Sequence, residues 1–178
     1  ANQGEVCADN SGMCVCMNPN DFNTDNSQYN YIFVTSGTWS GALGGIAGAN
    51  AKCDFAALSA GYSGDWIAVI SDASQNIASV LTDKPYYLLD GTLVANSKAD
   101  LLDGSLMNPI EVNEKMENMG MDYSGVWTGS SWSGMNNGYH CHGWGWIDAM
   151  GTNGAMYIKD GQWLAGAQAS CEQMKHLY

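Results

Sequence analysis

The chain contains no arginine in its 178 residues. Its basic residues are six scattered lysines, and 18 acidic residues give it a formal net charge of -12 at pH 7. The planar arginine fork is the side chain best suited to bidentate contacts with phosphate and sulfate, and a strongly negative surface repels polyanions at long range. The sequence therefore disfavours nucleic acid and sulfated glycans as partners and leaves cationic partners and divalent metal ions open.

Long apolar runs are also lacking. No stretch approaches the roughly 20 apolar residues that a membrane-spanning helix needs. The first residues show neither an initiator Met nor the basic-then-apolar pattern of a signal peptide, so we expect any signal peptide to have been removed or to lie outside this sequence. Composition predicts one soluble globular domain with a short appendage and without membrane insertion.

The sequence patterns of common catalytic machinery are absent as well. There is no G-x-S-x-G nucleophile elbow, no phosphate-binding Walker loop and no H-E-x-x-H zinc helix. Glu111 and Glu114 form an acidic pair of the kind that hydrolyses glycosides, but such pairs are ordinary surface features of an acidic chain. The sequence therefore predicts a binding or structural protein rather than an enzyme.

Six cysteines are present, and an even number in such a chain indicates three disulfides formed in an oxidising, extracellular or cell-surface compartment. The closest pair, Cys14 and Cys16, is spaced too tightly for the C-x-x-C pattern of a zinc site. Spacing alone leaves every pairing open among Cys7, Cys14, Cys16, Cys53, Cys141 and Cys171.

The distribution of residue types divides the chain near residue 30. Residues 1–30 are rich in Asn, Asp, Ser and Gly without an apolar period, which predicts an irregular N-terminal arm held by cysteines. Residues 31–178 predict the globular domain. In it we expect strands at 31–36 and 66–71, a helix in the Ala-rich segment 44–61, a short helix over 72–81 capped by Asp72, and short strands and turns over 82–125.

The last third of the chain places large aromatic residues among glycines, a pattern typical of short strands joined by tight turns. We expect Trp127, Trp144 and Trp163 to lie in the core. Trp132 is bracketed by serines and a glycine, which favours an exposed position.

The order of these segments resembles a known family. A strand containing IFVTS is followed by the helix segment GGIAGANAKC, then by WIAVIS, PYYLLDGTLVANSKADLLDGSL, VWTG, C-x-x-W and a terminal ASC. This succession is similar to endostatin-like domains, which have the C-type-lectin-like fold, and more so to the bacterial extracellular domains of that type. The resemblance covers residues 31–178. It implies an α+β fold with a mixed twisted sheet, two short helices, long loops and disulfides.

The same resemblance implies particular disulfides. Its pattern pairs Cys141 with Cys171, and it pairs the helix cysteine, Cys53, with a cysteine just past the position of Tyr178. This sequence stops short of that position, so either the partner lies beyond it or Cys53 pairs with the arm. The even cysteine count favours the arm. Because Cys14 and Cys16 are too close to bridge each other, Cys7 would then take one of them and Cys53 the other.

Two properties of animal endostatin-like domains do not transfer to this chain. Their heparin binding uses exposed arginines, which are absent here, and their zinc site uses an N-terminal histidine cluster that this chain also lacks. His140 and His142 flank Cys141 and are expected on the same side of a strand, where they would supply two ligands of a different zinc site. The alternative is two surface imidazoles beside a disulfide.

The arm suggests calcium as the candidate cofactor. Asp21, Asn23 and Asp25 alternate like the first ligands of a calcium loop. An EF-hand also requires Gly at the sixth position and Glu at the twelfth, where this chain has Asn26 and Ile32, so the EF-hand pattern is not met. A calcium site of less regular geometry stays open as an alternative. Asn/Asp-rich segments are more commonly turns. No cofactor is required by the sequence.

Ligand binding is expected in the loop 129–143. Trp132 and Tyr139 offer aromatic faces that stack on sugar rings, and they stand beside polar residues that hydrogen-bond sugar hydroxyls. The calcium-dependent sugar triplets of C-type lectins are absent, so this recognition would not use a metal. The expected ligand-binding residues are Trp132, Asn136, Asn137, Tyr139, His140 and His142.

These features together predict an extracellular recognition or adhesion domain. We expect it to be the ligand-binding tip of a bacterial surface or fibre protein that binds a glycan or a cell-surface protein. The alternative is a structural module that caps a fibre or holds it together as a homotrimer, without a ligand of its own.

Overall fold

The computed structural model describes residues 28–178 and two short strands of the arm, β1 (Val6–Cys7) and β2 (Cys16–Met17). The two strands pair antiparallel, with Cys7 opposite Cys16 in the register. Outside the described residues lie one arm cysteine and the candidate calcium ligands, namely Cys14, Asp21, Asn23 and Asp25.

The Ala-rich segment forms the longest described helix, α1 (Gly45–Ser59), as predicted. Ala49, Cys53 and Ala57 recur every four residues on its buried side, so one stripe of the helix faces the core. Gly44 precedes the helix with φ 87°, and Gly61 follows it with φ 93°. Glycine adopts this left-handed conformation without the steric cost of a Cβ atom, which explains both ends.

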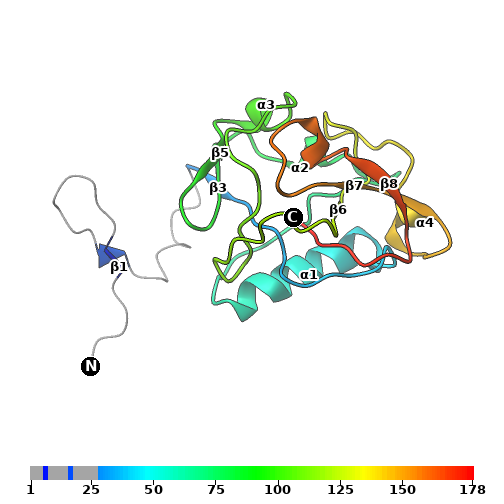
Figure 1. The fold of residues 1–178 in the computed structure, drawn as a ribbon, viewed down its shortest axis with the longest axis horizontal. Helices are drawn as coiled ribbons and strands as arrows, with labels where there is room; N and C mark the ends of the chain where they lie inside the picture. Colours follow the sequence, from blue (N-terminus) through cyan, green and yellow to red (C-terminus); the bar gives the residue numbers. More distant parts are fainter. Residues whose placement is uncertain (1–5, 8–15, 18–27) are drawn as a thin grey trace.

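Two three-stranded sheets form the rest of the regular structure (Figure 1). The first contains β3 (Asn30–Tyr31), β4 (Tyr86–Tyr87) and β5 (Leu93–Ala95). It is mixed, because β3 runs parallel to β4 and β5 runs antiparallel to it. The β4–β5 hairpin turns at Asp90-Gly91, within the segment predicted to hold short strands and turns, and Gly91 has φ 86° there.

The second sheet is antiparallel and has the order β6 (Val126–Trp127), β7 (Met150–Gly154) and β8 (Ala167–Ser170). Single-turn helices and long connections link the strands: α2 (Ile77–Val80), α3 (Lys98–Leu101), α4 (Cys141–Trp144) and the 3-10 turn η2 (Gly161–Trp163). The fold is therefore α+β with long loops, as predicted, although the strands of residues 28–178 form two separate sheets rather than one.

The predicted strand over residues 66–71 is not formed as a regular strand. The segment is extended, but its backbone amides bind oxygens from two distant segments: Val69 donates to Tyr178 and Ser71 donates to Thr128. Because successive hydrogen bonds change partner, no ladder develops along one neighbouring strand. The segment instead joins the C-terminus to the second sheet.

The short helix predicted over 72–81 begins later than expected, at Ile77. Asp72 does not cap it. Its carboxylate accepts hydrogen bonds from the backbone amides of Ser74 (2.7 Å) and Gln75 (3.0 Å) and so closes a turn before the helix. The amide of Ile77, the first residue of the helix, donates to the Ser71 hydroxyl at 2.9 Å, and Asn76, the residue before the helix, makes no side-chain cap.

The three tryptophans expected in the core, Trp127, Trp144 and Trp163, are each 0% exposed, which confirms that prediction. Trp127 and Trp144 lie with ring centroids 5.9 Å apart, in the same apolar cluster as the disulfide between Cys141 and Cys171. This disulfide is the one that the resemblance implies, and it joins α4 to the residue that follows β8.

No helix in the described part of the chain is long and apolar enough to cross a membrane.

Candidate ligand-binding pocket

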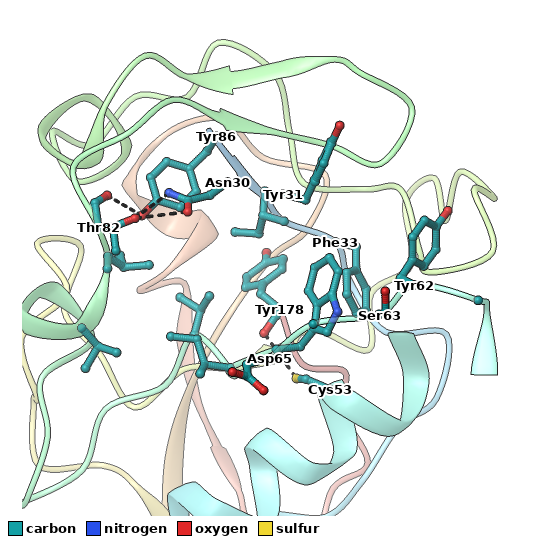
Figure 2. A pocket seen from close by; sticks show the side chains of 18 residues that line it. Asn30, Tyr31, Phe33, Cys53, Tyr62, Ser63, Asp65, Thr82, Tyr86 and Tyr178 are labelled. Carbon is teal, nitrogen blue, oxygen red and sulfur yellow. Dashed lines mark hydrogen bonds between the residues drawn. The ribbon is translucent and has the colours of Figure 1, made fainter. Parts of the chain in front are cut away.

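A pocket of about 240 Å³ opens between the end of α1, strand β3 and the end of α2 (Figure 2). It lies away from the loop 129–143 on which the sequence analysis concentrated. Its lining comes from five separate segments: Asn30, Tyr31, Ile32 and Phe33; Cys53; Gly61, Tyr62, Ser63, Gly64, Asp65, Trp66, Ile67 and Val69; Val80, Leu81, Thr82 and Tyr86; and Tyr178.

Aromatic rings dominate the wall of this pocket. The Phe33 and Trp66 ring centroids are 5.0 Å apart at an interplanar angle of 66°, and those of Tyr62 and Trp66 are 6.3 Å apart at 67°. In such edge-to-face contacts the positive edge of one ring meets the negative face of the next. The arrangement holds the three rings at fixed angles to one another, as a rigid apolar surface.

The Trp66 side chain carries a buried polar group. Its indole Nε1 has no hydrogen-bond partner among the described residues, while its backbone amide donates to the Asp54 carboxylate at 2.6 Å and so fixes the residue. An unpaired buried donor costs about 1–3 kcal/mol and is uncommon in folded proteins. Trp66 lines the pocket, but its Nε1 is shielded from solvent, so the pocket lining must shift before an oxygen acceptor of a ligand can pair with it.

The charge of the pocket comes from one exposed carboxylate, that of Asp65, since its lining holds no lysine or histidine. Burial raises the pKa of Tyr31, Tyr62 and Tyr86, so these phenols are neutral at physiological pH. The pocket therefore suits an uncharged or positively charged group and disfavours an anion.

At one edge of the pocket, side-chain hydrogen bonds join β3 to the segment after α2. The Asn30 amide nitrogen donates to the Thr82 hydroxyl at 2.8 Å, and that hydroxyl donates back to the Asn30 amide oxygen at 3.1 Å. The Tyr86 hydroxyl donates to the backbone oxygen of Thr82 at 2.8 Å. Figure 2 shows the Asn30 and Thr82 side chains meeting beside Tyr86.

Cys53 lies at the inner side of the pocket as a free, buried thiol. No disulfide joins Cys53 to another described residue, and the predicted bridge to the arm involves cysteine side chains outside the described residues, so it stays a prediction. Its sulfur points along the inner face of α1 toward the chain end, 3.7 Å from the backbone oxygen of Tyr178. This agrees with the other alternative in the resemblance, which places the partner of this cysteine just after Tyr178. Burial raises the pKa of the thiol to about 12.

In the predicted binding loop, Trp132 and Tyr139 are exposed, by 54% and 41%. A Cβ atom at Gly161 would lie 3.0 Å from the Cβ of Trp132, so the base of that side chain rests against the η2 turn. The backbone oxygen of Tyr139 instead accepts from the amide of Thr152 in β7 at 2.8 Å. Within the described residues no ring contact joins Trp132 to Tyr139.

The two asparagines of this loop have internal partners. The Asn137 amide nitrogen donates to the Ser130 backbone oxygen at 3.1 Å and to the Thr152 hydroxyl at 2.8 Å. The Asn136 amide oxygen accepts from the amide of Gly138 at 2.8 Å. Asn137 thus fastens the loop to β7. A direct contact of either residue with a ligand stays a prediction.

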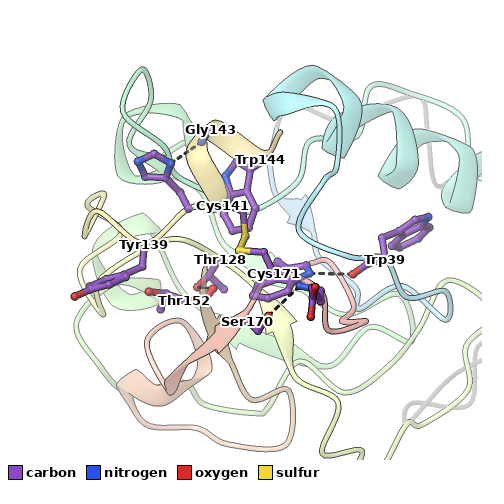
Figure 3. Close-up of a disulfide and its surroundings, with 12 residues drawn as sticks. Trp39, Thr128, Tyr139, Cys141, Gly143, Trp144, Thr152, Ser170 and Cys171 are labelled. Carbon is purple, nitrogen blue, oxygen red and sulfur yellow. Dashed lines mark hydrogen bonds between the residues drawn. A yellow bond between two sulfur atoms is a disulfide. The ribbon is translucent and has the colours of Figure 1, made fainter. Parts of the chain in front are cut away.

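His140 and His142 do not lie on a strand, so the prediction that they share one strand face is wrong. They flank Cys141 in the tight turn α4, where Cys141 and His142 have φ of 53° and 51°. His140 accepts a hydrogen bond from the amide of Gly143 through its Nδ1 at 2.8 Å. Figure 3 shows Gly143 and Trp144 of this turn with the disulfide between Cys141 and Cys171. In residues 28–178 no group of three or more His, Cys, Asp or Glu could hold a metal ion.

The pocket was not predicted from the sequence, because its aromatic residues lie next to apolar, strand-like segments and such residues are typical of a hydrophobic core. A signal was nevertheless present. The segment 61–66, GYSGDW, sets two aromatic residues among glycine, serine and aspartate, which is the pattern that marked Trp132 as exposed.

No protein-family model matches the chain, and a search of curated proteins finds no match either. The likeness to endostatin-like domains therefore rests on the residue motifs described above.

Proposed function

We propose that this chain is an extracellular recognition domain with the C-type-lectin-like fold. In this proposal it forms the ligand-binding tip of a bacterial surface or fibre protein and binds a glycan or a cell-surface protein without catalysis. The disulfide between Cys141 and Cys171 is compatible with an oxidising, extracellular compartment, and the motif order over residues 31–178 supports the fold.

The observation that carries the proposal is the unpaired indole N–H of Trp66 in a rigid aromatic pocket. Ligand pockets combine apolar walls with a few fixed polar groups. The polar groups in the lining of this pocket include the Trp66 indole N–H, the Asp65 carboxylate and the side chains of Asn30 and Thr82. A sugar ring or a side chain of a partner protein supplies both an apolar face and an oxygen acceptor. A positively charged group is favoured further by the carboxylate and the ring faces.

The indole N–H can be removed without removing the ring by the substitution Trp66→Phe. Because the donor is unpaired in the free protein, we expect the free energy of unfolding to stay the same or rise. Binding of a ligand that uses the donor should weaken by about tenfold, the worth of one hydrogen bond of about 1.4 kcal/mol. Gain or retention of stability together with loss of binding is the signature of a functional group.

Trp163 provides a matched control, since its indole Nε1 is also buried and unpaired but the residue does not line the pocket. Ligand-observed NMR with methyl α-mannoside, N-acetylglucosamine and tetramethylammonium would measure binding to the wild type, Trp66→Phe and Trp163→Phe. We expect at least one probe to lose affinity in Trp66→Phe alone. Binding of no probe, or equal binding to all three proteins, would overturn the role of the pocket.

A second candidate function, that of a structural or trimerisation module, is favoured by the outer face of α1. Phe55 and Leu58 are 72% and 61% exposed and share that face with the exposed residues Ala47 and Ala51. Such an apolar stripe is unusual on a helix that faces water and is typical of helix association.

Analytical ultracentrifugation of the wild type and of Phe55→Glu would test this second function. A trimer that dissociates in Phe55→Glu supports assembly through α1. A wild-type protein that stays monomeric as its concentration is raised contradicts it and leaves the recognition function as the better explanation.

A further inference from the structure

A second cavity, of about 200 Å³, lies at the sheet formed by β6, β7 and β8. It is bounded by the segment 122–125 before β6, by residues 153–158 at the end of β7, and by Gln162 and the residues before β8. We call it the tyrosine groove and define it by six of its lining residues: Asp122, Tyr123, Gly125, Asn153, Tyr157 and Gln162. None of these six residues lines the pocket beside Trp66.

The groove carries an aromatic platform. Tyr123 is 74% exposed, a higher fraction than that of any other large apolar or aromatic side chain in the described part of the chain. Its ring packs edge-to-face on Tyr157, with centroids 5.4 Å apart at 70°, so its orientation is fixed although it faces water. An aromatic ring held in this way stacks on the apolar face of a pyranose at little cost in side-chain entropy.

The polar side chains around the platform are held in place and keep further hydrogen-bonding capacity. Asn153 donates to the backbone oxygen of Ala167 at 3.1 Å, and Gln162 donates to the Asp160 carboxylate at 3.3 Å. A carboxamide has two donor hydrogens and two acceptor lone pairs, so each group has sites left for a ligand. Preorganised amides of this kind bind hydroxyl groups, which both donate and accept.

The floor of the groove depends on a glycine. Gly125 has φ 76°, and a Cβ atom at this position would lie 2.7 Å from the side-chain oxygen of Asn153. Any larger residue would therefore displace that carboxamide as well as strain the backbone. Because Gly125 has no side chain, it leaves room for the Asn153 amide to face the cavity.

The charge of the groove excludes anionic ligands. Its lining holds no lysine, arginine or histidine. Hydrogen bonds from Ser124 hold the pKa of Asp122 below its ordinary value, so this carboxylate is ionised at neutral pH. His176 lies 3.2 Å from the Asp122 carboxylate, is itself buried and does not line the cavity.

We infer that the tyrosine groove binds a neutral pyranose, stacked on Tyr123 and hydrogen-bonded to Asn153, Gln162 and Asp122. The inference names one ligand class for the proposed recognition function, but it rests on residues distinct from those of the pocket beside Trp66. The domain would thereby hold two ligand sites, one on each sheet.

Titration calorimetry with maltotriose and chitotriose, and with sialyllactose as the anionic comparison, would test the inference. We expect the wild type to bind a neutral trisaccharide with a Kd of about 1 mM or tighter and to bind sialyllactose more weakly. Tyr123→Ala should weaken binding by about tenfold or more, since it removes the stacking surface. Met174→Ala is the control, because this residue is 54% exposed and lines neither the groove nor the pocket beside Trp66.

Gln162→Ala provides a second variant that removes a hydrogen-bonding group without touching the aromatic pair, and thermal unfolding would confirm that each variant is folded. Absence of binding by both neutral sugars, or equal affinity of the wild type, Tyr123→Ala and Gln162→Ala, would overturn the inference. If Trp66→Phe weakens sugar binding and Tyr123→Ala does not, the sugar binds in the pocket beside Trp66. That result would contradict binding in the tyrosine groove and would still support the proposed recognition function.

Discussion

The sulfur of Cys53 lies 3.7 Å from the backbone oxygen of Tyr178, although the two residues are 125 positions apart. Cys53 belongs to the inner face of α1, and Tyr178 lies at the centre of the ribbon, where the chain end is marked in Figure 1. The thiol and the C-terminal backbone therefore meet inside the core, under the aromatic pocket.

A cysteine appended after Tyr178 should form a disulfide with Cys53. The sulfur already faces the point at which the added residue would begin, and the closed loop would span most of the domain. Such a long loop predicts stabilisation of about 4–5 kcal/mol, measured as the difference in urea midpoint between the oxidised extended chain and the same oxidised chain with Cys53→Ala, since reduction would also break the disulfide between Cys141 and Cys171. The extended chain with Cys53→Ala is the control. Two thiols that remain titratable under non-reducing conditions would contradict the prediction.

The free energy of unfolding should fall at alkaline pH. Burial raises the pKa of Cys53 to about 12 and raises the pKa of Tyr178 as well, so the folded state retains protons that the unfolded state loses first. Stability is therefore complete below the unfolded thiol pKa of about 8.5 and declines above it, by up to about 1.4 kcal/mol per pH unit for each group. Urea unfolding from pH 7 to 11 would measure the decline.

The same measurement on Cys53→Ala separates the two groups. Without the thiol, the decline should begin near pH 10, the ordinary pKa of an unfolded tyrosine, and not near pH 8.5. A decline that begins at the same pH in both proteins would show that Cys53 titrates normally.

Trp144→Ala and Trp132→Ala should differ sharply in stability. Trp144 is 0% exposed, and its indole donates to the backbone oxygen of Ser71 at 2.9 Å, so its loss leaves a cavity and an unpaired acceptor. We expect this substitution to cost about 3–5 kcal/mol. Trp132 is 54% exposed and should cost less than about 1 kcal/mol. Equal unfolding midpoints for the two variants would mean that Trp132 supports the fold.

The domain should not be retained on heparin at physiological salt. It has no arginine and a net charge of -12, and beyond about 8 Å surface charges are screened at this ionic strength. Chromatography of the isolated domain in about 0.15 M salt measures this directly. Retention would reveal a lysine cluster, which Lys52→Glu and Lys159→Glu variants could then locate.

Features that depend on a few neighbouring residues were predictable from the sequence. The buried stripe of α1, the turn at Asp90-Gly91 and the exposure of Trp132 follow from helical spacing, from the freedom of glycine and from flanking polar residues. The core position of Trp127, Trp144 and Trp163 was also correct, because large aromatic residues in strand-like runs need burial.

Features that depend on distant contacts could not be predicted. Residues 66–71 look like a strand, but their hydrogen bonds go to Thr128 and Tyr178, and nothing local encodes that choice. In α4, Cys141 and His142 adopt a left-handed backbone that non-glycine residues normally avoid. The disulfide and the burial of Trp144 hold this turn, and both arise from tertiary structure. The pocket beside Trp66 likewise exists only after five segments have met.

Four consecutive residues at the end of the chain, 175–178, are all buried. They pair with segments made much earlier: Lys175 with Trp39, and Leu177 with Thr35, which lies 142 positions before it. The segments around Thr35 and Trp39 therefore cannot complete this pairing until residues 175–178 have been synthesised. Closure of the domain thus depends on contacts of very long sequence separation, which are slow to form, so we expect the docking of residues 175–178 to be a late step in folding.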